Sequence, residues 1–349
     1  MGATRGPRRS TALALVIAIG VAALAGYLFS RPQDADHALL PVAIQAPVPR
    51  GPFSTIGYSV ADDPDANEVV VFGGDLSLNR TWLWNGGAWQ LSHPRTSPPG
   101  REEAATAYDP ALRMVVLFGG IRPPQTYLDD TWGWNGTTWH ELSSGGPPPG
   151  QASMAWDPAV NAMVLVPASS SGADTWTFTG THWVDHHQPD PYIPTGVLSL
   201  AFDPLSNILI AVGFGDVISP SEGSATQTWT WNGAVWQELT TRHTPSAYEL
   251  LGLAWDPATA KLLLFGEGSM TPVPQLNWEW TGSDWTQLPP LAQPRIIEGL
   301  LTGVDTGRLL LVGEPSEARG SDTPINVWGW TGRGWQAASS TLAVTSLPA

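Results

Sequence analysis

Three histidines and two aspartates form the cluster in this sequence that could hold a metal ion. They are His182, His186 and His187 with Asp185 and Asp190, and imidazole and carboxylate groups are common zinc ligands. This stretch is predicted below to be an outermost strand of a sheet, so we interpret it as a solvated edge. The chain has no Cys, which excludes disulfides, thiolate metal sites and a thiol nucleophile. Because no Ser-His-Asp order and no His-Glu-x-x-His run occurs either, we expect no metal, no cofactor and no catalytic residue.

Carboxylates are the second candidates for binding chemistry. The chain has 31 acidic and 16 basic residues, and beyond residue 30 it has 13 basic and 31 acidic residues, a formal net charge of −18. Such a surface repels phosphate backbones, which excludes nucleic acid as a partner. It favours cationic or polyhydroxyl groups instead.

The elements that must position these side chains are repeats of about fifty residues. Their first tryptophans stand at intervals of 50, 44, 53, 49 and 50, and are Trp82, Trp132, Trp176, Trp229, Trp278 and Trp328. Each is followed by a second aromatic residue two positions on, then a glycine, then a last Trp, as in Trp82-Leu-Trp84-Asn-Gly86-Gly-Ala-Trp89. Seventeen of the 19 Trp belong to this motif, and the other two, Trp156 and Trp255, precede an Asp-Pro pair.

Asp-Pro is the second recurring feature. The turn aspartates are Asp63, Asp109, Asp157, Asp203 and Asp256, with Asp305-Thr306 in the sixth copy. Six residues beyond each Asp stands an apolar residue: Val69, Val115, Met163, Leu209, Leu262 and Leu311. Asp at the first position and Pro at the second favour a type I turn, and Trp-x-Trp has the period of a strand. Each copy therefore predicts four short strands.

The glycine between the last two strands is predicted to make the hairpin turn. We expect positive φ, which other residues adopt only at a cost, at Gly86, Gly136, Gly180, Gly233, Gly282 and Gly332. Six copies of four strands predict an all-β fold, a six-bladed β-propeller spanning residues 51–340.

The repeats resemble the kelch-repeat family in a bacterial, tryptophan-rich form. The kelch glycine doublet stands at Gly73-Gly74 and Gly119-Gly120, and is lost in the third copy at Val166-Pro167-Ala168. The resemblance implies a propeller but not one function, because kelch propellers include binding platforms, sugar-active proteins and oxidases. The copper-radical oxidases of this type require a cysteine, which this chain lacks.

The N-terminus predicts a membrane anchor. Residues 1–10 are basic and would be cytoplasmic, residues 11–29 are uncharged and long enough to cross a bilayer, and residues 30–50 form a linker. The predicted protein is a single-pass membrane protein, N-in, with its propeller outside the cytoplasm. The alternative is secretion after cleavage near Ala25. A strand from residues 42–44 or 341–347, the latter within the tail 341–349, could close the ring.

The loops between the second and third strands are where we expect binding. They vary from 7 to 13 residues between copies, and variable loops on a rigid ring commonly carry recognition. Their candidate residues are Asp75, Arg122, Tyr127, Asp129, Asp130, Asp174, Asp216, Glu222, Glu267, Glu314, Glu317 and Asp322. We predict a monomeric, non-catalytic module for an unknown protein or glycan partner. The alternative is a sugar-directed enzyme, similar to a mutarotase or epimerase, that would use the central channel.

Overall fold

A computed structural model describes most of the repeat region. The described residues are 51–52, 57–74, 79–122, 124–168, 174–187, 198–213, 226–245, 249–267, 275–289, 295–302, 307–314 and 325–338. No helix within these ranges is long and apolar enough to cross a membrane. The predicted anchor, linker and C-terminal tail, and both segments considered for ring closure, lie outside them.

The first three blades are four-stranded antiparallel sheets, each from one contiguous repeat. Blade 1 contains β1 (Tyr58–Asp63), β2 (Glu68–Gly73), β3 (Thr81–Trp84) and β4 (Trp89–Ser92). Blade 2 contains β5 (Ala105–Asp109), β6 (Met114–Phe118), β9 (Thr131–Trp134) and β10 (Trp139–Ser143), with a small hairpin of β7 (Ile121–Arg122) and β8 (Thr126–Tyr127). Blade 3 contains β11 (Ala152–Asp157), β12 (Ala162–Pro167), β13 (Thr175–Phe178) and β14 (Trp183–His186).

The last three blades repeat this order. Blade 4 contains β15 (Leu198–Asp203), β16 (Ile208–Gly213), β17 (Gln227–Trp231) and β18 (Trp236–Leu239). Blade 5 contains β19 (Glu249–Asp256), β20 (Lys261–Glu267), β21 (Gln275–Trp280) and β22 (Trp285–Gln287). Blade 6 contains β23 (Arg295–Thr302), β24 (Leu309–Glu314), β25 (Asn326–Trp330) and β26 (Trp335–Ala337).

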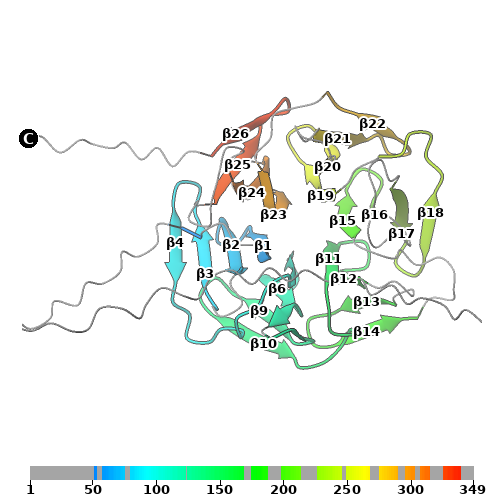
Figure 1. Cartoon of the computed structure of the whole chain (residues 1–349). Helices are drawn as coiled ribbons and strands as arrows, with labels where there is room; N and C mark the ends of the chain where they lie inside the picture. The colour runs from blue at the N-terminus through cyan, green and yellow to red at the C-terminus, as the bar shows by residue number, and fades with distance from the viewer. Residues whose placement is uncertain are drawn as a thin grey trace, which may run out of the picture. The chain divides into compact units, whose positions relative to one another are not determined.

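The six blades form a closed ring with their first strands innermost (Figure 1). The innermost strands contact one another in the order β1, β5, β11, β15, β19 and β23, and β23 contacts β1. Buried residues of blades 6 and 1, including Val312, Val327 and Val60, share one hydrophobic cluster. The amide of Ile325 donates to the carbonyl of Pro52 at 3.1 Å across the same seam. The prediction of a six-bladed propeller of four-stranded blades is confirmed.

The motif glycines and aspartates make the turns. All six hairpin glycines have positive φ, between 81° and 93°, as predicted. In the doublet, Gly74 has φ +74°, and a Cβ there would lie 2.2 Å from the ring of Tyr58. The turn aspartates of blades 1–5 are buried. Each carboxylate accepts the backbone N–H two residues further on, at 3.1 Å for Asp63 and 2.9 Å for Asp109.

In blades 1 to 5 the last Trp of the motif joins its blade to the preceding one. Its indole N–H donates to the hydroxyl of the Thr directly before the first motif Trp there, over 2.8–2.9 Å. The pairs are Trp139 to Thr81, Trp183 to Thr131, Trp236 to Thr175 and Trp285 to Thr228. At the closing seam Trp89 donates instead to the carbonyl of Ile325, at 3.2 Å. A buried N–H that finds its acceptor only on a neighbour fixes the angle between blades.

The seam between blades 5 and 6 departs from this pattern. Asn277 replaces the Thr there and is fully buried, and no described residue bonds either of its amide atoms. The indole N–H of Trp335, which would be its partner, is also buried and unpaired within the described structure. Two unsatisfied groups therefore face this seam.

The sequence placed Leu311 in blade 6 at the position of the apolar residue that follows the turn Asp in the other blades, and this placement is wrong. In blade 5 the apolar residue six positions after the turn Asp, Leu262, pairs with the second aromatic residue of the motif, Trp280, and blades 1–4 do the same. In blade 6, however, Leu311 pairs with the first, Trp328. The segment between β23 and β24 is two residues longer than the other turns. Leu309 thus takes the place assigned to Leu311.

The Asn277→Thr variant should be more stable than the wild type. A hydroxyl at this position would accept the indole N–H of Trp335 and would remove the unsatisfied amide, a gain of about 1–2 kcal/mol in the free energy of unfolding. The matched control, Thr175→Val, should lose about 1–3 kcal/mol because the N–H of Trp236 would be left unpaired. Urea denaturation measures both. An unchanged or lower stability for Asn277→Thr would contradict this view of the seam.

Candidate functional site

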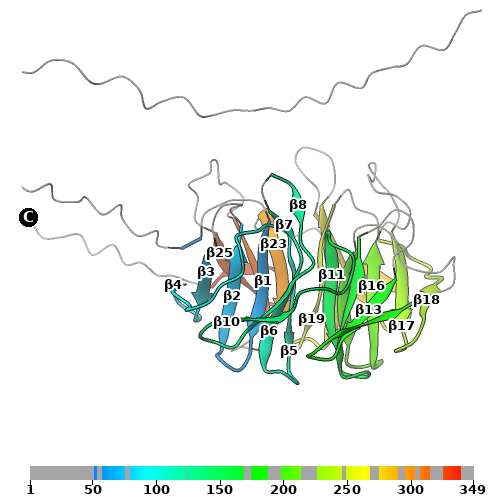
Figure 2. The same ribbon diagram turned by 90° about the horizontal axis from the view of Figure 1, so that it is seen from below.

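The strand ends that carry the predicted binding loops lie on one face of the ring, and much of the loops themselves falls outside the described residues. This holds for Asp75, Asp216, Glu222, Glu317 and Asp322, whereas Glu267 and Glu314 end β20 and β24 but their side chains are not described. The loop-face site therefore stays a prediction. Arg122, Tyr127 and Asp129 are exposed, on or just after the β7–β8 hairpin that projects from this face (Figure 2).

Asp130 has a structural role. Its carboxylate forms a bidentate ion pair with the fully buried Arg101, with N–O distances of 2.5 and 2.8 Å. It also accepts the indole N–H of Trp132 at 2.7 Å. Although burial raises the pKa of Asp130, the hydrogen bonds and charge of Arg101 outweigh it and hold that pKa below its usual value. This carboxylate is engaged inside blade 2.

The described members of the histidine cluster do not converge on one point, and Asp190 lies outside the described residues. His187 contacts Asp174 at 2.9 Å, whereas His186 contacts the hydroxyl of Thr177 at 2.8 Å. Within the described ranges no group of three or more His, Cys, Asp or Glu side chains could hold a metal ion.

A cavity of about 370 Å³ opens at the end of the central channel where the Asp-Pro turns lie. The innermost strands of blades 1 to 5 all contribute to its wall, and Pro110 and Pro204 of the turns line its rim. The cavity is thus on the face opposite the variable loops. Because residues of five separate repeats line it, the cavity cannot be predicted from any single segment of the sequence.

One position in each of blades 1 to 5 supplies the chemistry of this cavity. It is the residue directly before the turn aspartate: Asp62, Tyr108, Trp156, Phe202 and Trp255. All five are half-buried. The four aromatic rings also pack against the hydrophobic clusters between their own blade and the preceding one, so packing fixes them where they line the channel. Sequence reasoning noted that Trp156 and Trp255 precede Asp-Pro but did not place them in the channel.

Asp62 is the carboxylate of this described cavity wall. Burial raises its pKa from 3.8 to about 7, opposed by a backbone hydrogen bond and assisted by the neighbouring charge of Asp63. An acid whose pKa lies near neutrality inside a cleft is a recognised sign of a functional site.

Tyr108 is held by charged neighbours at the rim. The carboxylate of Asp65 accepts hydrogen bonds from Arg113 and Tyr108, and these lower the pKa of Asp65. Burial, followed by this hydrogen bond, raises the pKa of Tyr108 above its usual value. The phenol therefore has a fixed position beside the blade of Asp62.

No protein-family model and no curated protein matches this sequence. Solved structures do match its fold. YjhT is 13% identical, with a TM-score of 0.56, covering 83% of this chain and 99% of its own. The SapL1 lectin in complex with alpha methyl fucoside is 11% identical, with a TM-score of 0.53, covering 82% and 96%. A putative oxidoreductase (glucose dehydrogenase) from Thermus thermophilus is 13% identical, with a TM-score of 0.51, covering 78% and 96%. At these identities the likeness shows the propeller fold.

Asp130→Ala should lower stability by about 3–5 kcal/mol, because it would leave the guanidinium of Arg101 buried without its counter-ion. The neighbouring variant Asp129→Ala should change it by less than about 0.5 kcal/mol. Thermal unfolding followed by circular dichroism measures both. Equal melting temperatures for the two variants would show that the ion pair does not support blade 2.

Asp62→Asn should stabilise the protein more at pH 8 than at pH 5. Because the pKa of Asp62 is raised to about 7 on folding, the folded protein binds this proton more tightly than the unfolded chain does. Stability therefore falls as pH rises from about 4 to 7. After allowance for partial exposure, the gain at the two pH values should differ by about 1–2 kcal/mol. The same gain at both values would mean that Asp62 titrates normally.

Proposed function

We propose that this chain is a non-catalytic carbohydrate-binding propeller that takes a neutral sugar into the mouth of its central channel. The observation that carries the proposal is the ring formed by Tyr108, Trp156, Phe202 and Trp255 with Asp62 at one end of the channel. We propose that the propeller binds this sugar on the outer side of the cell membrane.

Aromatic rings suit this role because the C–H faces of a sugar are apolar. A half-buried indole offers a large flat surface at little conformational cost. Pockets for small ligands are mainly apolar, with a few polar groups that fix orientation. In this cavity Asp62, Thr106 and Tyr108 are such groups, and they come from the adjacent blades 1 and 2.

The charge of the protein favours a neutral ligand. With 31 acidic and 16 basic residues, and with Asp62 in the cavity wall, an anionic sugar would meet repulsion. The SapL1 lectin, a protein of similar fold that was solved with a fucoside, supports the ligand class without naming the sugar. Binding at the loop face around Tyr127 stays the rival location.

A sugar-directed enzyme is the second candidate, and one observation favours it. The pKa of Asp62, about 7, is suited to general acid–base catalysis at neutral pH. Such an enzyme would interconvert sugar anomers and would lose activity in Asp62→Asn. The binding proposal expects no acceleration of glucose mutarotation, which polarimetry measures directly.

A printed array of neutral and acidic glycans tests the proposal. The wild type should retain neutral glycans, and Trp156→Ala should weaken that binding about tenfold or more, because a stacking surface is lost. The matched control is Trp176→Ala. Trp176 packs against the same hydrophobic cluster as Trp156 but does not line the cavity, so it reports the effect of lost packing alone.

Two results would overturn the proposal. One is that no glycan on the array is retained. The other is that Trp156→Ala binds like the wild type while the loop-face variant Tyr127→Ala/Asp129→Ala does not, which would place recognition on the opposite face.

A further inference from the structure

We infer that the site has a second compartment, between blades 4 and 5, and that the glycan it takes is an oligosaccharide rather than a single sugar. This rests on the proposed function at the channel mouth and extends it. The second compartment is a cavity of about 210 Å³ whose wall includes Trp255. The same indole lines the channel cavity, so the two spaces share one aromatic side chain.

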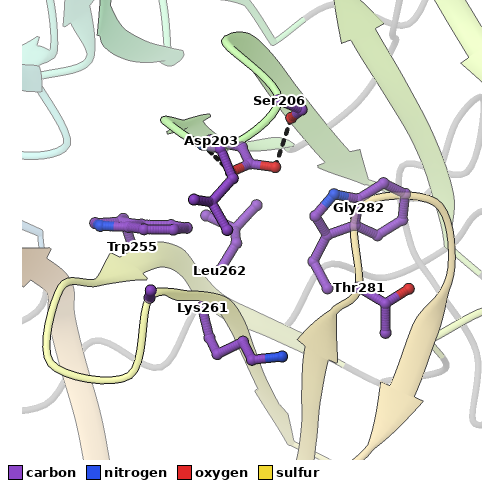
Figure 3. A pocket seen from close by; sticks show the side chains of 10 residues that line it. Asp203, Ser206, Trp255, Lys261, Leu262, Thr281 and Gly282 are labelled. Atoms are coloured by element: carbon purple, nitrogen blue, oxygen red, sulfur yellow. Dashed lines mark hydrogen bonds between the residues drawn. The ribbon is translucent and has the colours of Figure 1, made fainter.

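Three neighbouring elements build this second cavity (Figure 3). The end of β15 supplies Asp203, the turn after it supplies Ser206, β20 supplies Lys261, and the hairpin after β21 supplies Thr281. The cavity lies where these three elements meet at the seam between blades 4 and 5. It therefore opens on the same turn face as the channel mouth.

Its wall includes the polar side chains of Asp203, Ser206, Lys261 and Thr281. The Oγ of Ser206 donates to the Asp203 carboxylate at 2.5 Å, a contact drawn in Figure 3. Lys261, the single lysine of the chain, pairs with Glu279 at 2.7 Å, and its side chain is 41% exposed. An ammonium has three N–H donors, and Glu279 is the one described partner that takes any of them. An ammonium with donors to spare suits the hydroxyls of a sugar.

Leu205 lies between residues that line the two cavities. It follows Pro204, which lines the channel cavity, and itself lines the second cavity. Its side chain is 74% exposed. A glycan that entered the channel beside Trp255 would leave it past this turn, where its next unit would meet Ser206 and Lys261.

The test compares three lengths of one neutral glycan. The probes are the monosaccharide, disaccharide and trisaccharide of the series that the array selects, and isothermal titration calorimetry measures their affinity. For the wild type, affinity should rise at least fivefold from monosaccharide to trisaccharide. In Lys261→Met, which keeps the aliphatic stem, most of that rise should disappear while monosaccharide affinity stays unchanged.

Glu68→Met is the matched control, because Glu68 begins β2 as Lys261 begins β20 and lines neither cavity. It should retain the full dependence on length. If Lys261→Met lowers all three affinities equally or none, the second compartment is wrong while the channel site stands. If affinity does not rise with length in the wild type, the inference is likewise overturned. If no probe binds even to the wild type, the proposed function itself fails.

Discussion

The fold depends on a hydrogen bond that a blade cannot satisfy alone. The ring of the last Trp in a motif packs against the ring of the second aromatic residue of the same blade. The two ring centroids lie 5.0–5.5 Å apart in blades 2, 4, 5 and 6. In blades 2 to 5 its N–H then points to the preceding blade, where Thr81, Thr131, Thr175 or Thr228 accepts it. Since burying an unpaired N–H is costly, each of these seams has one favoured angle, and the angles together close a ring.

The candidate site follows from that ring. Six inner strands held at fixed angles leave a channel whose wall has one residue per blade at each level. At the level before the turn aspartates, those residues are one acid and four aromatic rings in blades 1–5. The buried aspartates fix the conformation of the turns, and the turns form the rim of the cavity. Rigid elements of this kind can position a ligand with little loss of conformational entropy.

Much of the fold was predictable because its signals are local and repeated. Trp, Gly and Asp at constant spacing define strands and turns directly. The register of blade 6 could not be predicted. A shift of two residues leaves the alternation of inward and outward side chains unchanged, so Leu309 and Leu311 face the same way. The role of Asp130 depends on Arg101, which lies 29 residues away. The residues of the channel wall stand directly before each turn Asp in the sequence. That they form one cavity could not be predicted, because it depends on five separate strands coming together in the fold.

A crystal structure of the protein with the tightest-binding neutral oligosaccharide tests the central claim most directly. The account predicts a sugar ring in the channel mouth against Trp156 and Trp255, with a hydroxyl bonded to Asp62 and the next unit beside Lys261. Sugar bound on the opposite face, at the β7–β8 hairpin with the channel mouth empty, would contradict it.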